Sequence, residues 1–380
     1  MSLEPRVRMT RASFVVFVAL AVSACGDDAE TGAGGASTGA NTDVTSDGGG
    51  GDGGAGGGSD GPTSGSTSAN SAGTGGDVTT VGSTSSSGGG TGVDDPNVDG
   101  PYATAETTDV IAATDGSDMA IFAAYPTAGP EAGPYPVIVV GHGFQLPASQ
   151  YASYIRRLAT HGFVALTADF PTSFFGVSNV DNAADLLASL DWAATAPALA
   201  GSADTAQAGM TGHSLGGKLA LLAASTDPRI KATITLDPVD GSMSCNPTDC
   251  PDVSDLMPLD IPTGFIGETT DAQGTFQACA PAADNFATFY AGTVAPSLQV
   301  TVLGANHMSF IDDVAGCGLT CSFCNDATVD NATVGALSRS YVVAFYRRWL
   351  KGESDYDAYL TGAQAQARYV ATGVATIQSK

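Results

Sequence analysis

The chain has 380 residues, a formal net charge of −25 and a sequence pI near 4.1. It sets 39 acidic residues against 14 Lys and Arg, whereas binding a phosphate backbone needs clustered cations, so we expect no nucleic-acid partner. Glycine contributes 49 residues, too many for one compact domain, and its uneven distribution divides the chain into three zones.

Residues 1–24 have the pattern of a secretory signal peptide. Arg6, Arg8 and Arg11 precede an apolar run at 14–22, and nine apolar residues are too few to cross a bilayer, which takes about 20. Small residues then lead to Cys25, and this pattern resembles the lipobox of bacterial lipoproteins. We expect cleavage before Cys25 and acylation of its thiol. The lipid would anchor the exported protein to a membrane, either within the cell envelope or at the cell surface. The alternative is an ordinary signal peptide that happens to end before a cysteine.

The second zone, residues 25–100, has the composition of a linker. Of the 75 residues that follow Cys25, 47 are Gly, Ser or Thr, and none is aromatic, Lys or Arg. Such a segment cannot bury enough apolar surface to offset the entropy of ordering it. We therefore predict a disordered acidic tether. Separately, we expect the exported protein to be a monomer.

Residues 101–380 are long enough for one large α/β domain. An antiparallel hairpin is predicted over 102–125, with its turn near Asp115. Short apolar runs that predict buried strands follow at 136–140, 163–168, 208–211, 230–236, 261–266 and 298–303. Helical spacing is found between them at 149–160, 180–194, 215–224, around 286–290 and at 336–350. Alternating strands and helices predict a doubly wound, mostly parallel sheet with helices on both faces.

Six cysteines remain after Cys25, and an even number in an exported chain indicates three disulfides. Fifteen pairings are possible, and the sequence does not choose among them. The close spacing of the last three leaves a metal site as the alternative. The six are Cys245, Cys250, Cys279, Cys317, Cys321 and Cys324.

A Gly-x-Ser-x-Gly motif at 212–216 lies after a predicted strand and before a predicted helix. This is the context of the nucleophile elbow, a tight turn that exposes a serine at the edge of the sheet in the α/β-hydrolase fold. Gly212 and Gly216 meet the need for residues without bulk on both sides of the turn. Ser214 is therefore the candidate nucleophile, and the alternative is a passive serine in a glycine-rich loop.

The loop after the first buried strand reads Gly-His-Gly-Phe at 141–144. In this fold that loop supplies one backbone N–H to an oxyanion, and the residue after the nucleophile supplies the other. Phe144 and Leu215 are therefore the candidate donors. His142 is expected to pack within the loop, with proton transfer as the alternative.

A serine nucleophile needs a base, and the chain has four histidines. His307 alone follows the nucleophile, as the order Ser, acid, His of this fold requires. His213 adjoins Ser214 and is expected to point away from it. His142 lies in the upstream loop, and His161 ends a predicted helix. Order and elimination thus agree on His307.

The acid is less well determined by the residues themselves. Asp237 ends the strand after the elbow helix, whereas Asp271 or Glu268 follows the next strand, and both positions are used for the acid in this fold. Pro238 breaks the chain directly after Asp237, which suits a fixed carboxylate. Spacing alone leaves the alternatives open.

Together these motifs resemble the chlorophyllase-type branch of the α/β-hydrolases, which is related to cutinase-like polyesterases and platelet-activating-factor acetylhydrolase. The pieces of the resemblance lie between about residues 135 and 313, and the string Leu-Asp-Pro-Val-Asp-Gly at 236–241 is the most specific. In that family the first Asp of this string is the catalytic acid, which implies the role for Asp237. The chain departs from the family in having Asn306 before the histidine and Leu215 after the serine.

These features predict a serine carboxylic-ester hydrolase that uses a Ser-His-Asp triad and an acyl-enzyme intermediate. The substrate would be a small-molecule or polymeric ester, and the chemistry needs no metal and no organic cofactor. The alternatives are an amidase or peptidase of the same fold, because the triad chemistry is shared, or an inactive surface-binding lipoprotein.

Overall fold

The computed structural model describes residues 92–173, 178–241, 245–273 and 278–380. The predicted signal peptide, Cys25 and the predicted linker up to residue 91 lie outside the described residues. Residues 92–100, just before the expected domain boundary, contact the domain. Asp95 pairs with Arg368 at 2.7 Å, and the carbonyl of Val98 accepts a hydrogen bond from Nε2 of His161 at 2.9 Å.

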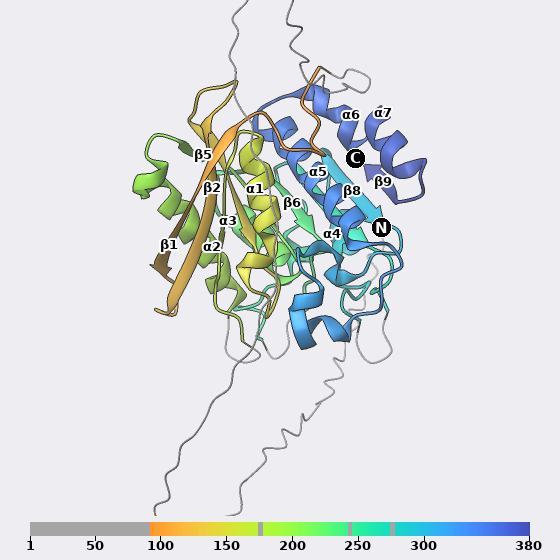
Figure 1. The fold of residues 1–380 in the computed structure, drawn as a ribbon. Coiled ribbons are helices and arrows are strands. Elements are labelled where there is room, and N and C mark those ends of the chain that lie inside the picture. The colour runs from red at the N-terminus through yellow and green to blue at the C-terminus, as the bar shows by residue number, and fades with distance from the viewer. Residues whose placement is uncertain (1–91, 174–177, 242–244, 274–277) are drawn as a thin grey trace, which may run out of the picture. The chain divides into compact units, whose positions relative to one another are not determined.

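In the part of the chain that the structure describes, a nine-stranded, mostly parallel sheet runs through the domain (Figure 1). Its strands lie in the order β1-β2-β4-β3-β5-β6-β7-β8-β9. Strands β3 to β8 are parallel to their neighbours in this group, while β1, β2 and β9 pair antiparallel. The strands are β1 Ala103–Ala112, β2 Asp118–Ala128, β3 Tyr135–Gly141, β4 Val164–Ala168, β5 Ala203–Gly212, β6 Ile230–Leu236, β7 Thr263–Glu268, β8 Ser297–Val302 and β9 Ala375–Ser379. The predicted α/β-hydrolase fold is confirmed.

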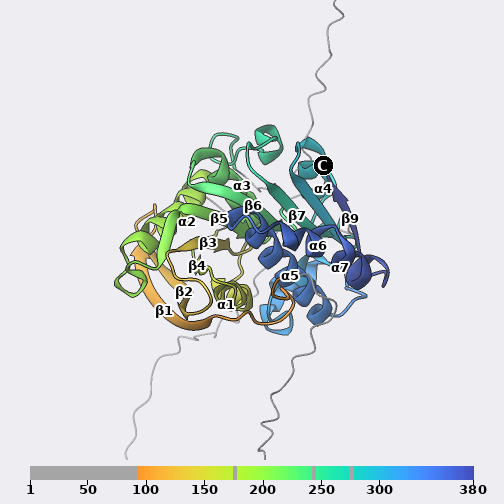
Figure 2. The same ribbon diagram turned by 90° about the horizontal axis from the view of Figure 1, so that it is seen from above.

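Helices cover both faces of this sheet, with α2 and α3 on one side and α1, α5 and α6 on the other (Figure 2). The α-helices are α1 Ala152–Thr160, α2 Asn179–Thr195, α3 Leu215–Thr226, α4 Phe286–Gly292, α5 Asn331–Leu350, α6 Asp357–Leu360 and α7 Ala363–Ala365. The short segments are η1 Ala148–Tyr151, η2 Pro197–Leu199, η3 Val253–Leu256, η4 His307–Phe310, η5 Ala315–Phe323, η6 Ser354–Tyr356 and η7 Gln366–Val370.

The alternation of side chains along the central strand β3 creates two hydrophobic cores. Ile138 and Val140 pack into the core beneath α1 and α5, whereas Val137 and Val139 pack into the core beneath α2, α3 and α4. All four are fully buried. A strand covered on both faces reads as a continuous apolar run, which explains why the sequence predicted this element well.

The predicted elements are present, and the differences lie at their ends. The hairpin turns as predicted, and Gly116 adopts a positive φ of 84° in the turn. Helix α5 begins five residues before its predicted start, because the Asp330 side chain caps it by accepting the N–H of Thr333 at 2.8 Å. Strand β9 was not predicted, since it is a short and largely polar edge strand.

The six cysteines form three disulfides, as predicted. The pairs are Cys245–Cys250, Cys279–Cys324 and Cys317–Cys321. Disulfides persist in oxidising compartments, which agrees with the predicted export. In the part of the chain that the structure describes, no helix has both the length and the apolar character needed to cross a membrane.

Helix α5 packs closely on the sheet where Tyr346 lies against Gly209 of β5. A Cβ atom at Gly209 would overlap the Tyr346 ring and lie 2.9 Å from Cδ1 of Ile138. We expect Gly209→Ala to lower the free energy of unfolding by about 1–3 kcal/mol, as overpacking of a core does. Urea unfolding followed by circular dichroism measures this change.

Gly335→Ala in α5 is the matched control. The nearest atoms to an added Cβ there belong to the far end of the long Arg339 side chain, the first at 3.0 Å. Alanine also favours a helix over glycine by up to about 1 kcal/mol, so we expect stability to be unchanged or raised. Equal losses in the two variants would contradict the tight packing at Gly209.

Candidate active site

Ser214 lies in a strained turn between β5, which ends at Gly212, and α3, which begins at Leu215. Its backbone has a φ of 55° and a ψ of −120°, a conformation that is uncommon for residues with a side chain. Its N–H donates to the carbonyl of Leu236 at 3.1 Å, so the turn is also tied to β6. These features are those of the predicted nucleophile elbow.

Two glycines allow this turn to form. A Cβ atom at Gly212 would overlap the backbone of Gly216, and a Cβ atom at Gly216 would overlap the carbonyl of Gly141. The elbow therefore packs directly against the end of β3, where the predicted oxyanion loop begins. The structure thus explains both glycines of the motif by backbone contact.

The structure brings Ser214, His307 and Asp237 together. The Oγ of Ser214 lies 2.8 Å from Nε2 of His307, and Nδ1 of His307 lies 2.6 Å from Oδ2 of Asp237. Because a carboxylate accepts, the hydrogen is on Nδ1, which leaves Nε2 to accept the proton of the Ser214 hydroxyl. His307 and Asp237 are both buried, so water does not compete for these bonds.

The two other candidate acids also lie near His307 but do not hold its ring. Oδ2 of Asp271 accepts the backbone N–H of His307 at 2.8 Å, and its Oδ1 accepts the N–H of Asn325 at 2.7 Å. Glu268 accepts the N–H of Asp271 at 2.9 Å. Asp237 therefore orients the imidazole, while Asp271 fixes the backbone of the histidine.

Three buried carboxyl groups lie together at the ends of β6 and β7. Burial raises the pKa of Glu268 to about 7, and the negative charges of Asp237 and Asp271 act in the same direction. Burial also raises the pKa of Asp237, while its hydrogen bond with His307 opposes this effect. Glu268 thus takes up a proton near neutral pH, which limits the negative charge behind the histidine.

The string at 236–241 joins the loop after β6 to the elbow helix. Asp240 forms a buried ion pair with Lys218 of α3, with Nζ 2.5 Å from Oδ1. A Cβ atom at Gly217 would lie 2.8 Å from Cβ of Pro238, so the helix and this loop are in close contact. These two contacts hold the string against α3, and they thereby fix the position of Asp237 relative to Ser214.

Phe144 and Leu215 are the residues that the sequence predicted as backbone donors. Leu215 is the first residue of α3, where N–H groups have no acceptor within the helix and the helix dipole favours negative charge. Phe144 follows Gly143 in the loop after β3, which lies against the elbow. His142 stacks on Phe170, which follows β4, with ring centroids 3.8 Å apart, and its Nδ1 lies 2.9 Å from the carbonyl oxygen of Gly143 in its own loop.

Sequence reasoning missed the role of His213 beside the serine. It is fully buried, and its Nε2 lies 2.8 Å from the backbone carbonyl of His307. Its Nδ1 lies 2.8 Å from the hydroxyl of Tyr151, a residue that the sequence did not single out. A contact to a backbone carbonyl leaves no pattern in the sequence, which is why neither residue was predicted.

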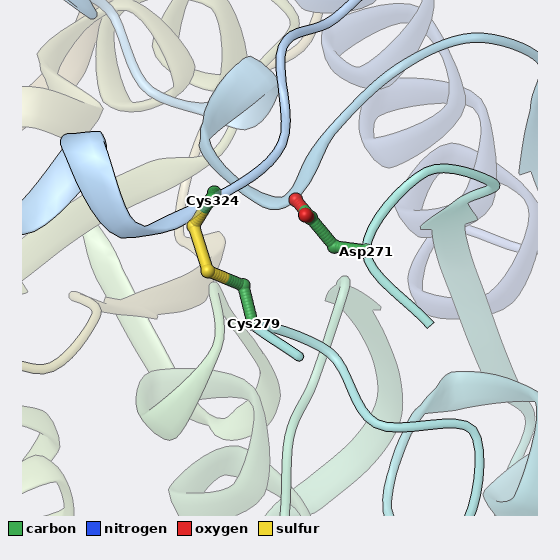
Figure 3. A group of neighbouring side chains, drawn as sticks. All are labelled: Asp271, Cys279 and Cys324. Carbon is green, nitrogen blue, oxygen red and sulfur yellow. A yellow bond between two sulfur atoms is a disulfide. The ribbon is translucent and has the colours of Figure 1, made fainter. Parts of the chain in front are cut away.

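Asp271 also lies near two sulfur atoms, those of Cys279 and Cys324 (Figure 3). The three side chains are close enough to hold a metal ion, but both sulfurs are joined in a disulfide and so offer no thiolate. Cys324 directly precedes Asn325, whose N–H is bound by Asp271. In the described structure, this disulfide therefore supports the loop beneath His307.

A family model described as Chlorophyllase matches residues 99–370, well over half of the chain. The chain belongs to the chlorophyllase family. The expected resemblance is thereby confirmed, and with it an activity of the ester-hydrolase type.

Individual relatives agree with this assignment. Chlorophyllase-1 of Arabidopsis thaliana is 29% identical over 249 residues, which cover 58% of this chain and 74% of the relative. Bis(hydroxyethyl) terephthalate hydrolase of Streptomyces coelicolor is 31% identical over 264 residues, which cover 69% of this chain and 71% of the relative. The family member described here is accordingly a hydrolase that acts on esters.

The raised pKa of Glu268 predicts a pH dependence of stability. A carboxyl whose pKa rises on folding from 4.5 to about 7 binds its proton more tightly in the folded state. Its contribution to the free energy of unfolding is therefore present at low pH and is lost as pH rises through 7. We expect the free energy of unfolding of wild type, relative to Glu268→Gln, to fall between pH 4.5 and pH 7. Urea unfolding at several pH values measures this difference. Parallel pH curves for the two proteins would contradict it.

Proposed function

We propose that this chlorophyllase-family protein is a serine carboxylic-ester hydrolase with Ser214 as nucleophile, His307 as base and Asp237 as acid. The observation that carries the proposal is the continuous hydrogen-bond chain from Asp237 through His307 to Ser214, with distances of 2.6 Å and 2.8 Å. Such a chain is what converts a weakly nucleophilic hydroxyl into an attacking group near neutral pH.

The proposed reaction proceeds in two halves. The Oγ of Ser214 forms a bond to the ester carbonyl carbon while its proton passes to Nε2 of His307. The backbone N–H groups of Phe144 and Leu215 stabilise the oxyanion, and removing one such donor costs about 2.7–4 kcal/mol of transition-state stabilisation in a well-studied protease. The intermediate collapses, the C–O bond to the alcohol breaks, and His307 gives the proton to the departing alcohol.

The second half releases the acid. Water gives a proton to His307 and attacks the acyl carbon, and the bond to Oγ of Ser214 then breaks as the proton returns to the serine. Throughout, Asp237 holds the imidazole in one tautomer and stabilises the imidazolium that forms twice in each turnover. These side chains and backbone groups perform every step of the proposed reaction.

We propose small-molecule or polymeric esters as substrates, because the printed names of the relatives include chlorophyllases and a bis(hydroxyethyl) terephthalate hydrolase. The predicted signal peptide and lipidated Cys25 further suggest an exported enzyme that acts from a membrane anchor. A panel of esters of graded chain length, a terephthalate ester and chlorophyll tests the substrate class. Hydrolysis of amides in place of all these esters would contradict it.

Replacing the nucleophile or the base should abolish activity. We expect Ser214→Ala and His307→Ala each to lower kcat for p-nitrophenyl ester hydrolysis by at least about 10³-fold, as loss of a triad member does elsewhere. Hydrolysis followed by absorbance measures the loss, and circular dichroism controls for folding. Wild-type rates in either variant would overturn the proposed mechanism.

The two acids should differ in their effect. Asp237→Asn removes the acceptor that fixes the His307 tautomer, and the same change in a serine protease lowers kcat about 10⁴-fold. Asp271→Asn keeps one oxygen that can accept the His307 N–H and loses the acceptor of the Asn325 N–H, so we expect a loss of less than about tenfold. Steady-state kinetics on the two variants compares them. A larger loss for Asp271→Asn would reassign the acid.

A further inference from the structure

Tyr151 connects two parts of the proposed active site that are far apart in the sequence. The N–H of Gly143, the residue before Phe144, donates to the Tyr151 hydroxyl at 3.0 Å. The same hydroxyl lies 2.8 Å from Nδ1 of His213. On the other side of its ring, Nε2 of His213 lies 2.8 Å from the carbonyl oxygen of His307.

Chemistry fixes the direction of each of these hydrogen bonds. The carbonyl of His307 can only accept, so Nε2 of His213 carries the hydrogen and Nδ1 is the acceptor. Tyr151 must therefore donate its proton to Nδ1, which leaves its oxygen to accept from Gly143. The result is one continuous chain that runs from Gly143 through Tyr151 and His213 to the backbone of His307.

Burial keeps this chain in a single protonation state. Tyr151 and His213 both have no measurable exposure to solvent. Burial raises the pKa of Tyr151, so the hydroxyl stays protonated, and burial lowers the pKa of His213 well below its ordinary value, so the imidazole stays neutral. A neutral imidazole has one donor and one acceptor, which is what the two contacts require.

We propose that Tyr151 and His213 are positioning residues that hold the base and the oxyanion loop at a fixed spacing around the nucleophile. This inference rests on the proposed function, because it assigns the base to His307 and an oxyanion donor to Phe144. The ring of His213 packs against that of His307, with ring centroids 4.7 Å apart, but its hydrogen bond goes to the backbone of His307. Tyr151 bonds to the backbone of Gly143, the residue before the proposed oxyanion donor.

The geometry shows why such spacing needs support. The oxyanion loop, the elbow and the base come from three separate segments, at Gly143, Ser214 and His307. An error of about 1 Å in the alignment of such groups can lower a rate about 100-fold. The space beside Gly143 is also tight, since a Cβ atom there would lie 3.1 Å from Nδ1 of His213 and 3.2 Å from the hydroxyl of Tyr151.

Tyr151→Phe removes the hydroxyl that joins Gly143 to His213 in this hydrogen-bond chain. We expect kcat for p-nitrophenyl ester hydrolysis to fall at least tenfold while KM stays within twofold, because the misplaced groups act on the transition state and not on substrate binding. A purely structural role would lower only the fraction of folded enzyme, so kcat is calculated per active site counted by fluorophosphonate titration. An unchanged kcat per active site would contradict the positioning role.

Tyr154→Phe is the matched control. Tyr154 is equally buried, and its hydroxyl donates to the carbonyl of Phe310 at 2.9 Å, at the far end of η4. The change removes one buried hydroxyl and leaves one carbonyl without its donor, so the cost in stability is comparable. We expect kcat to remain within about twofold of wild type.

Two changes at His213 test its hydrogen bonds to Tyr151 and His307 separately. They also provide a second test if Tyr151→Phe does not fold. The amide nitrogen of Gln can take the place of Nε2 and donate to His307, whereas the amide oxygen of Asn can take the place of Nδ1 and accept from Tyr151. We expect kcat to decrease from wild type to His213→Gln and further to His213→Asn, since the second variant releases His307. Equal activity in wild type and both variants would overturn the proposal.

Hydrogen exchange distinguishes a failure of this proposal from a failure of the proposed function. In Tyr151→Phe we expect faster amide exchange both near Gly143 and near His307, although 164 positions separate them in the sequence. Unchanged exchange at both places and unchanged kcat would remove the positioning role and leave the esterase intact. A wild-type protein that hydrolyses no ester would instead contradict the proposed function, whatever the exchange shows.

Discussion

Parallel pairing of β5, β6, β7 and β8 is the constraint on which the site depends. Parallel strands end at the same edge of a sheet, so the segments that follow them meet there although they are far apart in the sequence. The serine follows β5, the orienting carboxylate follows β6, and the histidine follows β8. The antiparallel strands at the two edges of the sheet carry none of these groups.

Contacts between backbones refine this coarse alignment. The elbow has no room for a side chain at Gly212 or Gly216, so Ser214 is held in a strained conformation against the end of β3. Both backbone groups of His307 are hydrogen-bonded, the N–H to Asp271 and the carbonyl to His213. The ring of His307 is thus directed by its backbone as well as by Asp237.

Much of this arrangement could be predicted from the sequence. The serine motif lies between a strand and a helix, and His307 is the one histidine in the required order, so both follow from pattern and elimination. The carboxylate could not be chosen by spacing, because Asp237 and Asp271 both follow strands that end at the site. The resemblance to the chlorophyllase-type enzymes favoured Asp237, and the 2.6 Å contact to Nδ1 agrees with it.

The remaining features depend on packing that leaves no local signal. His213 was expected only to point away from the serine, whereas the structure places its two ring nitrogens against a backbone carbonyl and a tyrosine from another helical segment. Strand β9 is polar and lies at the edge, so its sequence lacks the apolar run of the buried strands. The position of the His213 ring and the formation of β9 both depend on tertiary contacts.

In the proposed mechanism a single activated serine carries the acyl group, and chemical trapping can identify that serine. A fluorophosphonate forms a stable bond to an activated serine, and peptide mapping by mass spectrometry then identifies the labelled residue. We expect the adduct on Ser214 and on no other serine, with ester hydrolysis lost in proportion to labelling. An adduct on a different residue, or full hydrolysis by protein whose Ser214 is completely labelled, would contradict it.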